Sequence, residues 1–552
     1  MDPTGRARSV TRRLAHAGLV TASVIAVGVL PAAAATAAPT GPQRSAMGKI
    51  RLSALSSGAR TWWSPPTATE ESPKASRAAV AFGTNVDAND PSKDFGSGQS
   101  ETAIAASGDH VMAAWNDISG AMYLPTTDPQ GSVTGVGYSS DGGRSFTDLI
   151  GLANNNPYQQ WYGDPTVVAV DANTFIVGGL YYPSLAADCA KAPQLLEAAV
   201  EVATVGANNQ VSFSEPVVVA SGGDYCGLIN DPDNPPPDLA QPDKEWLAYD
   251  PATRTVAVSY TRFYFGDAGQ SGDGQVELVR AHLPASARTL SSADFAGPTV
   301  VWPEEATVVN TGAYAAVSAT GDTYVAWERN IDTNLSNGDP YVYIHAAKVP
   351  AGAGAPTVGG PASPVVVTAG QQNSSAAGGV KSLDGTSISG YSRGLGNDFP
   401  RIALDPALGR VVFAWNDASL HPLGDIFLRT LDMSLASPTA IAKVNDDSSY
   451  ALHFLPAVSV RSNGAIVTSW YDRRRGGPQS TLTDYYAEVR SRPTTSASDV
   501  RISTGQSDWT GVSSLINPNF GDYTDNTSSG NRTYFTWSDG RIGVPQPFVD
   551  RR

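Results

Sequence analysis

Acidic residues that could perform acid–base chemistry recur at two positions of a repeated phrase in this chain. One set lies just before or at the start of an apolar run and comprises Glu101, Asp164, Asp243, Glu245, Asp398 and Asp522. A second set, which includes Asp117, Asp417, Asp472 and Asp539, follows an aromatic residue. Carboxyl groups gathered at one place repel each other, so some acquire raised pKa values and can serve as general acids. Their oxygens also suit Ca²⁺.

A plainer interpretation stays open for each of these residues. An Asp beside a strand often only caps a turn, because its carboxylate accepts hydrogen bonds from nearby backbone N–H groups. For a single Asp we favour capping. A functional role is indicated only by the recurrence of the whole set, and the two interpretations remain open for it.

Three arginines suggest recognition of an acidic ligand. Arg473, Arg474 and Arg541 follow matching positions of two adjacent repeats, so they could approach one another. A planar guanidinium binds a carboxylate or a sulfate with two hydrogen bonds, which suits an acidic sugar. The alternative is that they form ion pairs with Asp472 and Asp539.

The repeated phrase itself predicts the elements that must position these groups. Its clearest copies are 101–117, 398–417 and 453–472, and weaker copies begin at Gly163, Asp243, Thr311 and Phe520. Each copy has two short apolar runs joined by a turn, which is typical of two β-strands. The period of roughly 55–85 residues leaves room for two more strands, so each unit resembles a four-stranded blade of a β-propeller.

The number of blades can be inferred from the aromatic residue that ends the second run of each unit. These landmarks are Trp115, Leu180–Tyr181, Tyr260, Trp327, Trp415, Trp470 and Trp537. Large apolar groups are needed to pack wedge-shaped blades against each other. We therefore expect an all-β propeller of seven four-stranded blades over 76–552. Six blades remain an alternative, if the unit at Gly163 or the one at Thr311 is an insertion.

The last predicted blade lacks one strand, and this predicts how the ring closes. After Trp537 there is one further apolar run, 546–550, so we expect 78–82 to complete the last blade. Closure by the two chain ends removes a free sheet edge. In such a ring both acidic sets and the arginines are predicted to gather at one face, the mouth of the central channel.

The N-terminus has the pattern of an export signal. Arg6, Arg8, Arg12 and Arg13 precede an apolar run at 19–30 and a small-residue zone at 32–38. We expect cleavage after a signal peptide at 1–38, a flexible leader at 39–75, and a secreted protein. Removing 1–38 changes the formal charge from −15 to −18. This acidity disfavours nucleic-acid partners, the apolar run is short for a membrane span, and we expect a monomer.

The two cysteines fit export. Cys189 and Cys226 bracket the insertion that follows the second unit, and outside the cell we expect a disulfide between them. They have no CxxC spacing, and the six His are scattered. The sequence therefore predicts no zinc site, and Ca²⁺ is the cofactor that remains a candidate.

One short motif carries a family resemblance. The segment 139–146, SSDGGRSF, resembles the Asp-box (BNR) repeat of the sialidase-like propeller superfamily. Its residues predict a hairpin turn: Asp141 accepts backbone N–H groups, Gly142 and Gly143 supply positive φ, and Phe146 packs between strands. The resemblance implies a structural role for Ser139, Asp141, Gly143 and Phe146, at the face away from the site.

The same resemblance implies candidates for catalysis. Sialidases use three arginines on the substrate carboxylate, a Tyr nucleophile activated by Glu, and an Asp acid/base. The matching candidates are Tyr471 or Tyr523 with Glu245 or Glu101, and Asp164 or Asp398 as the acid. The sialidase Arg-Ile-Pro phrase is replaced here by Phe-Pro-Arg-Ile at 399–402, in a late blade.

Two functions follow as expectations. The first is an exported glycoside hydrolase, or a lyase, that acts at the channel mouth on extracellular and acidic glycans, with Asp117, Asp243 and Asp522 beside the arginines as binding residues. The second is a non-catalytic propeller that binds glycan or a protein partner.

Overall fold

The structure is a computed structural model, and it describes most of the chain beyond residue 84. The described residues are 85–93, 98–122, 131–153, 160–182, 196–224, 226, 239–264, 273–284, 289–305, 308–330, 341–352, 354–370, 380–381, 399–420, 423–448, 450–477, 480–512 and 520–552. The predicted signal peptide, the leader, Cys189 and Asp398 lie outside them.

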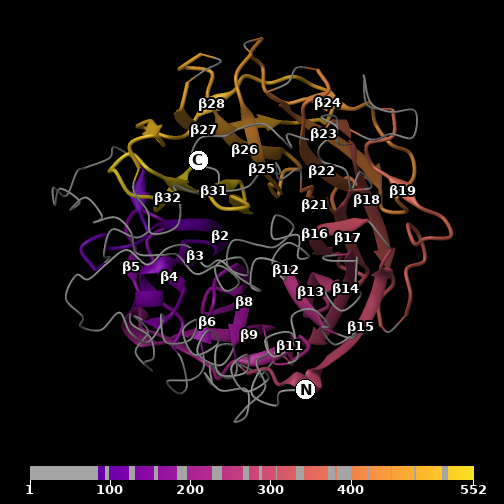
Figure 1. The fold of residues 1–552 in the computed structure, drawn as a ribbon, viewed down its shortest axis with the longest axis horizontal. Helices are drawn as coiled ribbons and strands as arrows, with labels where there is room; N and C mark the ends of the chain where they lie inside the picture. The colour runs from indigo at the N-terminus through magenta and orange to yellow at the C-terminus, as the bar shows by residue number, and fades with distance from the viewer. Residues whose placement is uncertain are drawn as a thin grey trace, which may run out of the picture.

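The described strands form seven antiparallel sheets arranged as the blades of a propeller (Figure 1). Blade 1 contains β2 (Gln99–Ser107), β3 (His110–Asp117), β4 (Thr134–Ser139) and β5 (Thr147–Asp148). Blade 2 contains β6 (Gln160–Trp161), β7 (Thr166–Asp171), β8 (Thr174–Tyr182), β9 (Glu197–Val205), β10 (Val211–Phe213) and β11 (Val217–Ser221). Blade 3 contains β12 (Ala240–Asp250), β13 (Thr255–Tyr264), β14 (Asp273–His282) and β15 (Phe295–Trp302).

The remaining blades follow the same order from the centre outward. Blade 4 contains β16 (Val309–Val317), β17 (Thr323–Asn330), β18 (Tyr341–Val349), β19 (Val365–Val366) and β20 (Val380–Lys381). Blade 5 contains β21 (Arg401–Asp405), β22 (Arg410–Asp417), β23 (Asp425–Asp432) and β24 (Ala442–Lys443). Blade 6 contains β25 (His453–Val460), β26 (Ile466–Asp472), β27 (Leu482–Arg490), β28 (Val500–Arg501) and β29 (Ser507–Asp508).

Blade 7 closes the ring with both ends of the described chain. It contains β30 (Asp525–Ser529), β31 (Arg532–Asp539), β32 (Gln546–Arg551) and, as its outer strand, β1 (Val86–Asp87). Val86 pairs with Val549 in β32, which confirms closure by an N-terminal strand. The strand lies four residues beyond the predicted end at 82, and 78–82 itself is outside the described residues. Seven blades are confirmed, and the units at Gly163 and Thr311 are both blades.

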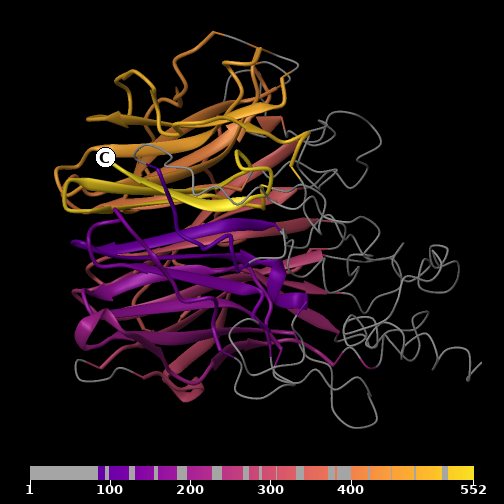
Figure 2. The same ribbon diagram turned by 90° about the vertical axis from the view of Figure 1, so that its left-hand side faces the viewer.

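Short 3₁₀ turns occur at η2 (Ile118–Met122), η4 (Ala207–Asn209) and η5 (Ser292–Asp294). Figure 2 shows the strands running from one face of the ring to the other. The predicted aromatic landmarks lie between blades, and Trp115, Trp327, Trp415, Trp470 and Trp537 are each at most 1% exposed. The hydrophobic core is therefore a ring of contacts between neighbouring blades rather than one central cluster.

A repeated β-bulge at the start of the inner strand brings side chains to the channel mouth. In blades 1, 3, 4 and 6, two residues of the inner strand lie opposite the aromatic landmark of the second strand. The first residue of each pair has a left-handed backbone: Glu101 (φ 53°), Lys244 (φ 58°), Gly312 (φ 64°) and Leu455 (φ 50°). Bulges bend a strand and turn its side chains. The left-handed residues therefore concentrate backbone strain at this face.

The segment 139–146 forms the turn between β4 and β5. Asp141 accepts hydrogen bonds from the backbone N–H groups of Arg144 (2.8 Å) and Ser145 (3.0 Å), and Gly142 and Gly143 have φ near 75°. The Gly142 N–H donates to the Asp109 carbonyl (2.8 Å) in the turn where inner strand β2 ends. The turn therefore lies at the face opposite the mouth, and its residues make structural contacts.

Candidate functional site

Three carboxyl groups meet at the channel mouth, where blades 2 and 3 are neighbours. Asp164 precedes β7, and Asp243 and Glu245 lie on either side of the bulged Lys244 in β12. One oxygen of each carboxyl lies within 4.8 Å of those of the other two. All three side chains are buried, with Glu245 the most exposed at 4%. The structure thus brings together residues that the sequence predicted to share this face.

Residues from blades 7 and 1 complete this group. Lys244 Nζ forms an ion pair with Asp522, which comes from the opposite side of the ring. The Asp522 backbone N–H donates to Glu101 Oε1 (2.9 Å). We call Glu101, Asp164, Asp243, Lys244, Glu245 and Asp522 the mouth cluster.

Blade 1 also anchors Asp164 through an asparagine. The Asn116 side chain donates from Nδ2 to Glu101 Oε2, and its Oδ1 accepts from the Asp164 backbone N–H (2.6 Å). Asp164 is held there with a left-handed backbone (φ 53°).

Burial and mutual repulsion change the acidity of the mouth cluster. Burial raises the pKa of Asp164 well above its ordinary value, and the nearby Glu101, Asp243 and Glu245 act in the same direction. Burial together with Asp243 raises the pKa of Glu245 in the same way. These groups are buried in the structure. Contact of the mouth acids with a substrate stays a prediction.

Arg401 packs against three aromatic side chains around the channel axis. Its guanidinium carbon lies 4.0 Å from the Tyr314 ring centroid, 4.7 Å from that of Trp246 and 5.6 Å from that of Tyr523. Its Nε donates to the Pro456 carbonyl (3.1 Å) and its Nη2 to the Thr524 carbonyl. Cation–π contacts of this kind stabilise a buried cation. Arg401 therefore fixes the aromatic side chains of three blades around the axis.

Below Arg401 lies a cavity of about 290 Å³, which we call the axial cavity. All seven inner strands line it: β2, β7, β12, β16, β21, β25 and β30. Its wall combines the partly exposed Trp246 with Arg401, Asp525, Asn526 and Ser528. The cavity lining exposes more polar than apolar surface, and charged and hydrogen-bonding side chains from several blades converge on it.

Asp525 is the carboxyl group of this cavity among the described lining residues. Its Oδ2 accepts a hydrogen bond from the Ile104 backbone N–H (3.1 Å), and its Oδ1 accepts one from the Asn526 N–H (2.9 Å). Burial raises the pKa of Asp525 to about 7, although Arg401 acts in the opposite direction. A group that titrates near neutral pH inside a cavity is a candidate proton donor.

Tyr471, a predicted nucleophile, does not face the channel. It lies between blades 6 and 7, where its ring packs against Phe454 and Phe520, and its hydroxyl donates to the Ser538 carbonyl (2.8 Å). Burial raises the pKa of the hydroxyl well above its ordinary value. A neutral, buried phenol cannot attack a substrate, so the structure argues against this role. The other candidate, Tyr523, lies at the axis and donates to the Pro165 carbonyl (2.8 Å).

The carboxylates that follow the aromatic landmarks cap turns. Asp117 Oδ1 accepts from the Ser119 backbone N–H (3.0 Å), and Asp417 Oδ1 accepts from that of Ser419 (2.8 Å). Asp472 accepts from the backbone N–H of Arg474, two residues on (2.8 Å), and Asp539 accepts from that of Arg541 in the same way (2.9 Å). The capping interpretation therefore accounts for Asp117 and its counterparts in blades 5, 6 and 7.

Two predicted ligand-binding arginines belong to the same turns. Arg541 Nε donates to Asp539 (2.9 Å), and Arg474 Nε donates to Asp472 (2.9 Å). Arg474 and Arg541 therefore form the ion pairs with Asp472 and Asp539 that the alternative interpretation predicted. Arg473 is buried; its Nε donates to Thr483 (3.0 Å), and burial lowers its pKa to about 10. The three guanidinium groups are held by protein groups rather than presented together to a ligand.

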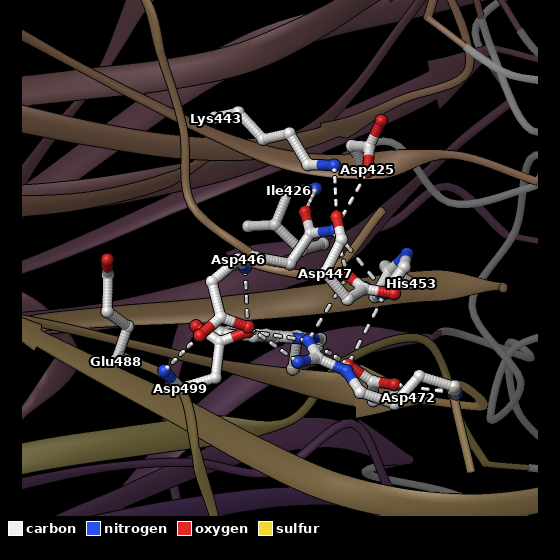
Figure 3. Close-up of polar contacts among 12 residues, drawn as sticks. Asp425, Ile426, Lys443, Asp446, Asp447, His453, Asp472, Glu488 and Asp499 are labelled. Carbon is white, nitrogen blue, oxygen red and sulfur yellow. Dashed lines mark hydrogen bonds and ion pairs between the residues drawn. The ribbon is translucent and has the colours of Figure 1, made fainter. Parts of the chain in front are cut away.

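Arg474 is the centre of an acidic network between blades 5 and 6. Figure 3 shows Asp446, Asp447, Asp472 and Asp499 of this network around His453. It contacts Asp446 (2.9 Å), Asp499 (2.6 Å) and Asp472 (2.7 Å). His453 Nε2 lies 3.1 Å from Asp447 and 3.4 Å from Asp472, and these carboxylates help to raise its pKa despite burial. Because its charges are largely paired within the protein, we interpret the network as structural.

Asp499 gives this network a pH dependence. Burial raises the pKa of Asp499 to about 7, and its side-chain hydrogen bond with Asp446 acts in the same direction. In an unfolded chain, the pKa of an Asp side chain is about 3.9. The folded state therefore keeps a proton that the unfolded state loses. The stabilisation is complete below about pH 4 and is lost as the pH rises through about 7.

We therefore expect the wild type to lose more free energy of unfolding between about pH 5 and 8 than the variant Asp499→Asn, which cannot ionise. Urea unfolding at both pH values measures the difference. Equal losses in the two proteins would contradict the assignment.

No protein-family profile matches the sequence, and no curated protein matches it. Among solved structures, the chain is similar to a Dyadobacter fermentans protein of unknown function, with 11% identity, coverage of 85% of this chain and 98% of that chain, and a TM-score of 0.41. It is also similar to a Penicillium chrysogenum α-L-arabinanase in complex with arabinobiose (9% identity, 85% and 98% coverage, TM-score 0.38). A Hadza microbial sialidase gives 9% identity, 75% and 72% coverage and a TM-score of 0.37.

The strand pairing itself establishes the propeller, and likenesses at this level assign no activity. In the described part of the chain, no helix has the length and hydropathy needed to cross a membrane. Cys226 is buried, but Cys189 is outside the described residues, so the disulfide stays a prediction.

Proposed function

We propose that this chain is an extracellular glycan-active protein whose ligand binds in the axial cavity, where it is hydrolysed with Asp525 as the proton donor. The observation that carries the proposal is the convergence of Trp246, Arg401 and Asp525 on one cavity of about 290 Å³. Trp246 offers a flat apolar surface with a polar N–H, which suits the mixed surface of a sugar ring. Arg401 places a positive charge in the wall, which favours an acidic glycan.

Two features of the sequence support the rest of the proposal. The basic, apolar and small-residue order of 1–38 supports export. The Asp-box-like turn at 139–146 supports a sialidase-like propeller. The site differs from the one that the sequence predicted, because it lies below the mouth cluster and uses Arg401 in place of Arg473, Arg474 and Arg541.

A second candidate function is glycan binding without turnover. Most glycoside hydrolases need two carboxyl groups, about 5–10 Å apart. The described lining of the axial cavity supplies one, Asp525, and Asp398, which precedes Arg401 by three residues, lies outside the described residues. The single carboxyl is the observation that favours this candidate.

One experiment separates the two functions. The secreted protein is incubated with a panel of aryl glycosides that includes a sialoside and a glucuronide, and titration calorimetry follows binding of neutral and acidic oligosaccharides. Turnover supports the hydrolase, whereas binding without turnover supports the second candidate. Absence of both would overturn the proposal.

A further inference from the structure

We propose that Asp164, Asp243 and Glu245 bind a calcium ion that joins blades 2 and 3 at the channel mouth. Three carboxylate oxygens, one from each residue, lie within 4.8 Å of one another. Calcium–oxygen distances are about 2.3–2.6 Å, so two oxygens on opposite sides of one ion are about 5 Å apart. The three oxygens therefore fit around a single Ca²⁺, for which hard anionic ligands are suited.

The state of Glu245 points to a missing ligand. Both of its carboxylate oxygens are buried, and neither accepts a hydrogen bond from another described residue. The side chain is 4% exposed, so bulk water does not replace the missing donors. A buried carboxylate without a donor or cation is strongly disfavoured. A cation between Glu245 and its two neighbours would supply the interaction that its oxygens lack.

The nearest ammonium group does not neutralise the three carboxylates. Lys244 is the cation that acts on both Asp164 and Glu245. Its Nζ, however, forms an ion pair with Asp522, whose side chain is fully buried. Among the described residues, the charge of Lys244 thus faces Asp522 and three further carboxyls, and a divalent ion would add positive charge at this place.

The backbone is arranged to direct these carboxyl groups to one point. Asp164 and Lys244 both have left-handed φ values, 53° and 58°, which non-glycine residues rarely adopt. In β12 the bulge at Lys244 and Glu245 turns the start of the strand, and Asn116 holds the Asp164 backbone. Strained positions persist only where the surroundings impose them, and they often mark ligand sites. The ion would link β12 to the segment before β7.

The test measures calcium uptake and its effect on stability in the full secreted chain. Protein stripped with EDTA is titrated with CaCl₂, and bound calcium is counted by elemental analysis. We expect about one ion per chain, and a rise in Tm of about 2–4 °C at saturating Ca²⁺. The variant Glu245→Gln is expected to lose both responses. MgCl₂ serves as a parallel arm, in which a smaller rise in Tm is expected because Mg²⁺ demands a more regular geometry.

A crossover distinguishes a cation site from a merely structural carboxyl. In EDTA, Glu245→Gln should be at least as stable as the wild type, because the neutral amide is close in size and needs no cation in this buried place. In Ca²⁺ the order should reverse. The matched control is Glu201→Gln, a carboxyl that is 1% exposed and accepts from Trp161 Nε1 (3.1 Å) in blade 2, away from this site. Its Ca²⁺ response should equal that of the wild type.

Each outcome decides the matter. If stripped wild type binds no calcium, or if Glu245→Gln responds to CaCl₂ as the wild type does, the proposal is wrong. Should Glu245→Gln not fold, Asp243→Asn provides the same comparison. This test is independent of glycan turnover, so either proposal can fail without the other.

Discussion

Replacing Asp525 by asparagine is expected to lower kcat of the proposed glycan hydrolysis by about 10²–10⁴-fold, with binding changed only a few-fold. The carboxyl faces the axial cavity and its pKa is raised to about 7, so near neutral pH it holds a proton that it can donate. Asparagine is close in size and keeps an oxygen that can accept from Ile104 or Asn526. It cannot, however, transfer a proton to a leaving group.

The pH profile gives a second readout for Asp525. In the wild type, kcat should fall as the pH rises above about 7, because the donor becomes ionised, and in Asp525→Asn this limb should be absent. The matched control is Asp499→Asn, whose carboxyl also has a pKa raised to about 7 but lies in the network of Arg474. That control should keep wild-type kcat. Wild-type turnover in Asp525→Asn would exclude Asp525 as the donor.

The fold could be predicted from the sequence because its signals are local. Each inner hairpin shows the alternation of a strand pair, and the aromatic landmark, such as Trp415 or Trp470, recurs once per blade. These residues must be large and apolar wherever two blades meet. The prediction of the closing strand was less exact. The strand β1 pairs through only two residues, Val86 and Asp87, and so short a strand shows no alternation of apolar and polar residues.

The mouth cluster was predictable for a similar reason. Asp164, Asp243 and Asp522 all lie at the start of an inner strand, and in a closed ring these starts meet. The axial cavity was not predictable in the same way. Arg401 and Asp525 are 124 residues apart and become neighbours only through the curvature of the ring. The one signal was the position of Arg401 at the beginning of β21, where the chain reads Phe-Pro-Arg-Ile.

The arginines show how a local signal can be misinterpreted. The sequence has Trp470, Asp472 and Arg474 at alternate positions, and the same order recurs in blade 7 at 537, 539 and 541. In both blades the Trp Nε1 and the Arg guanidinium donate to the Asp between them. The recurrence indicated a self-contained turn, since a side chain committed to its own neighbour is not presented to a ligand.

Replacing Lys244 by methionine is expected to lower the free energy of unfolding by about 3–5 kcal/mol. Lys244 and Asp522 are 3% and 0% exposed, and their ion pair joins blade 3 to blade 7 across the channel. Methionine fills much of the same volume beside Phe399, over which the ammonium lies at 5.1 Å. In the variant, Asp522 stays buried without the ammonium group of Lys244. This loss of charge compensation is the source of the expected decrease in the free energy of unfolding. Urea unfolding in EDTA measures the change.

The double variant Lys244→Met/Asp522→Asn tests that explanation. If the loss of stability comes from the uncompensated carboxylate, removing the charge of Asp522 should restore much of that stability. If it comes from packing defects, the losses from the two substitutions should instead add up in the double variant. The control is Lys93→Met, because Lys93 is 39% exposed in its ion pairs with Asp90 and Asp148 and should contribute about 0–1 kcal/mol. A loss from Lys244→Met as small as that of the control would mean that the ion pair across the channel does not hold the ring together. The mouth would then depend on blade-to-blade packing alone.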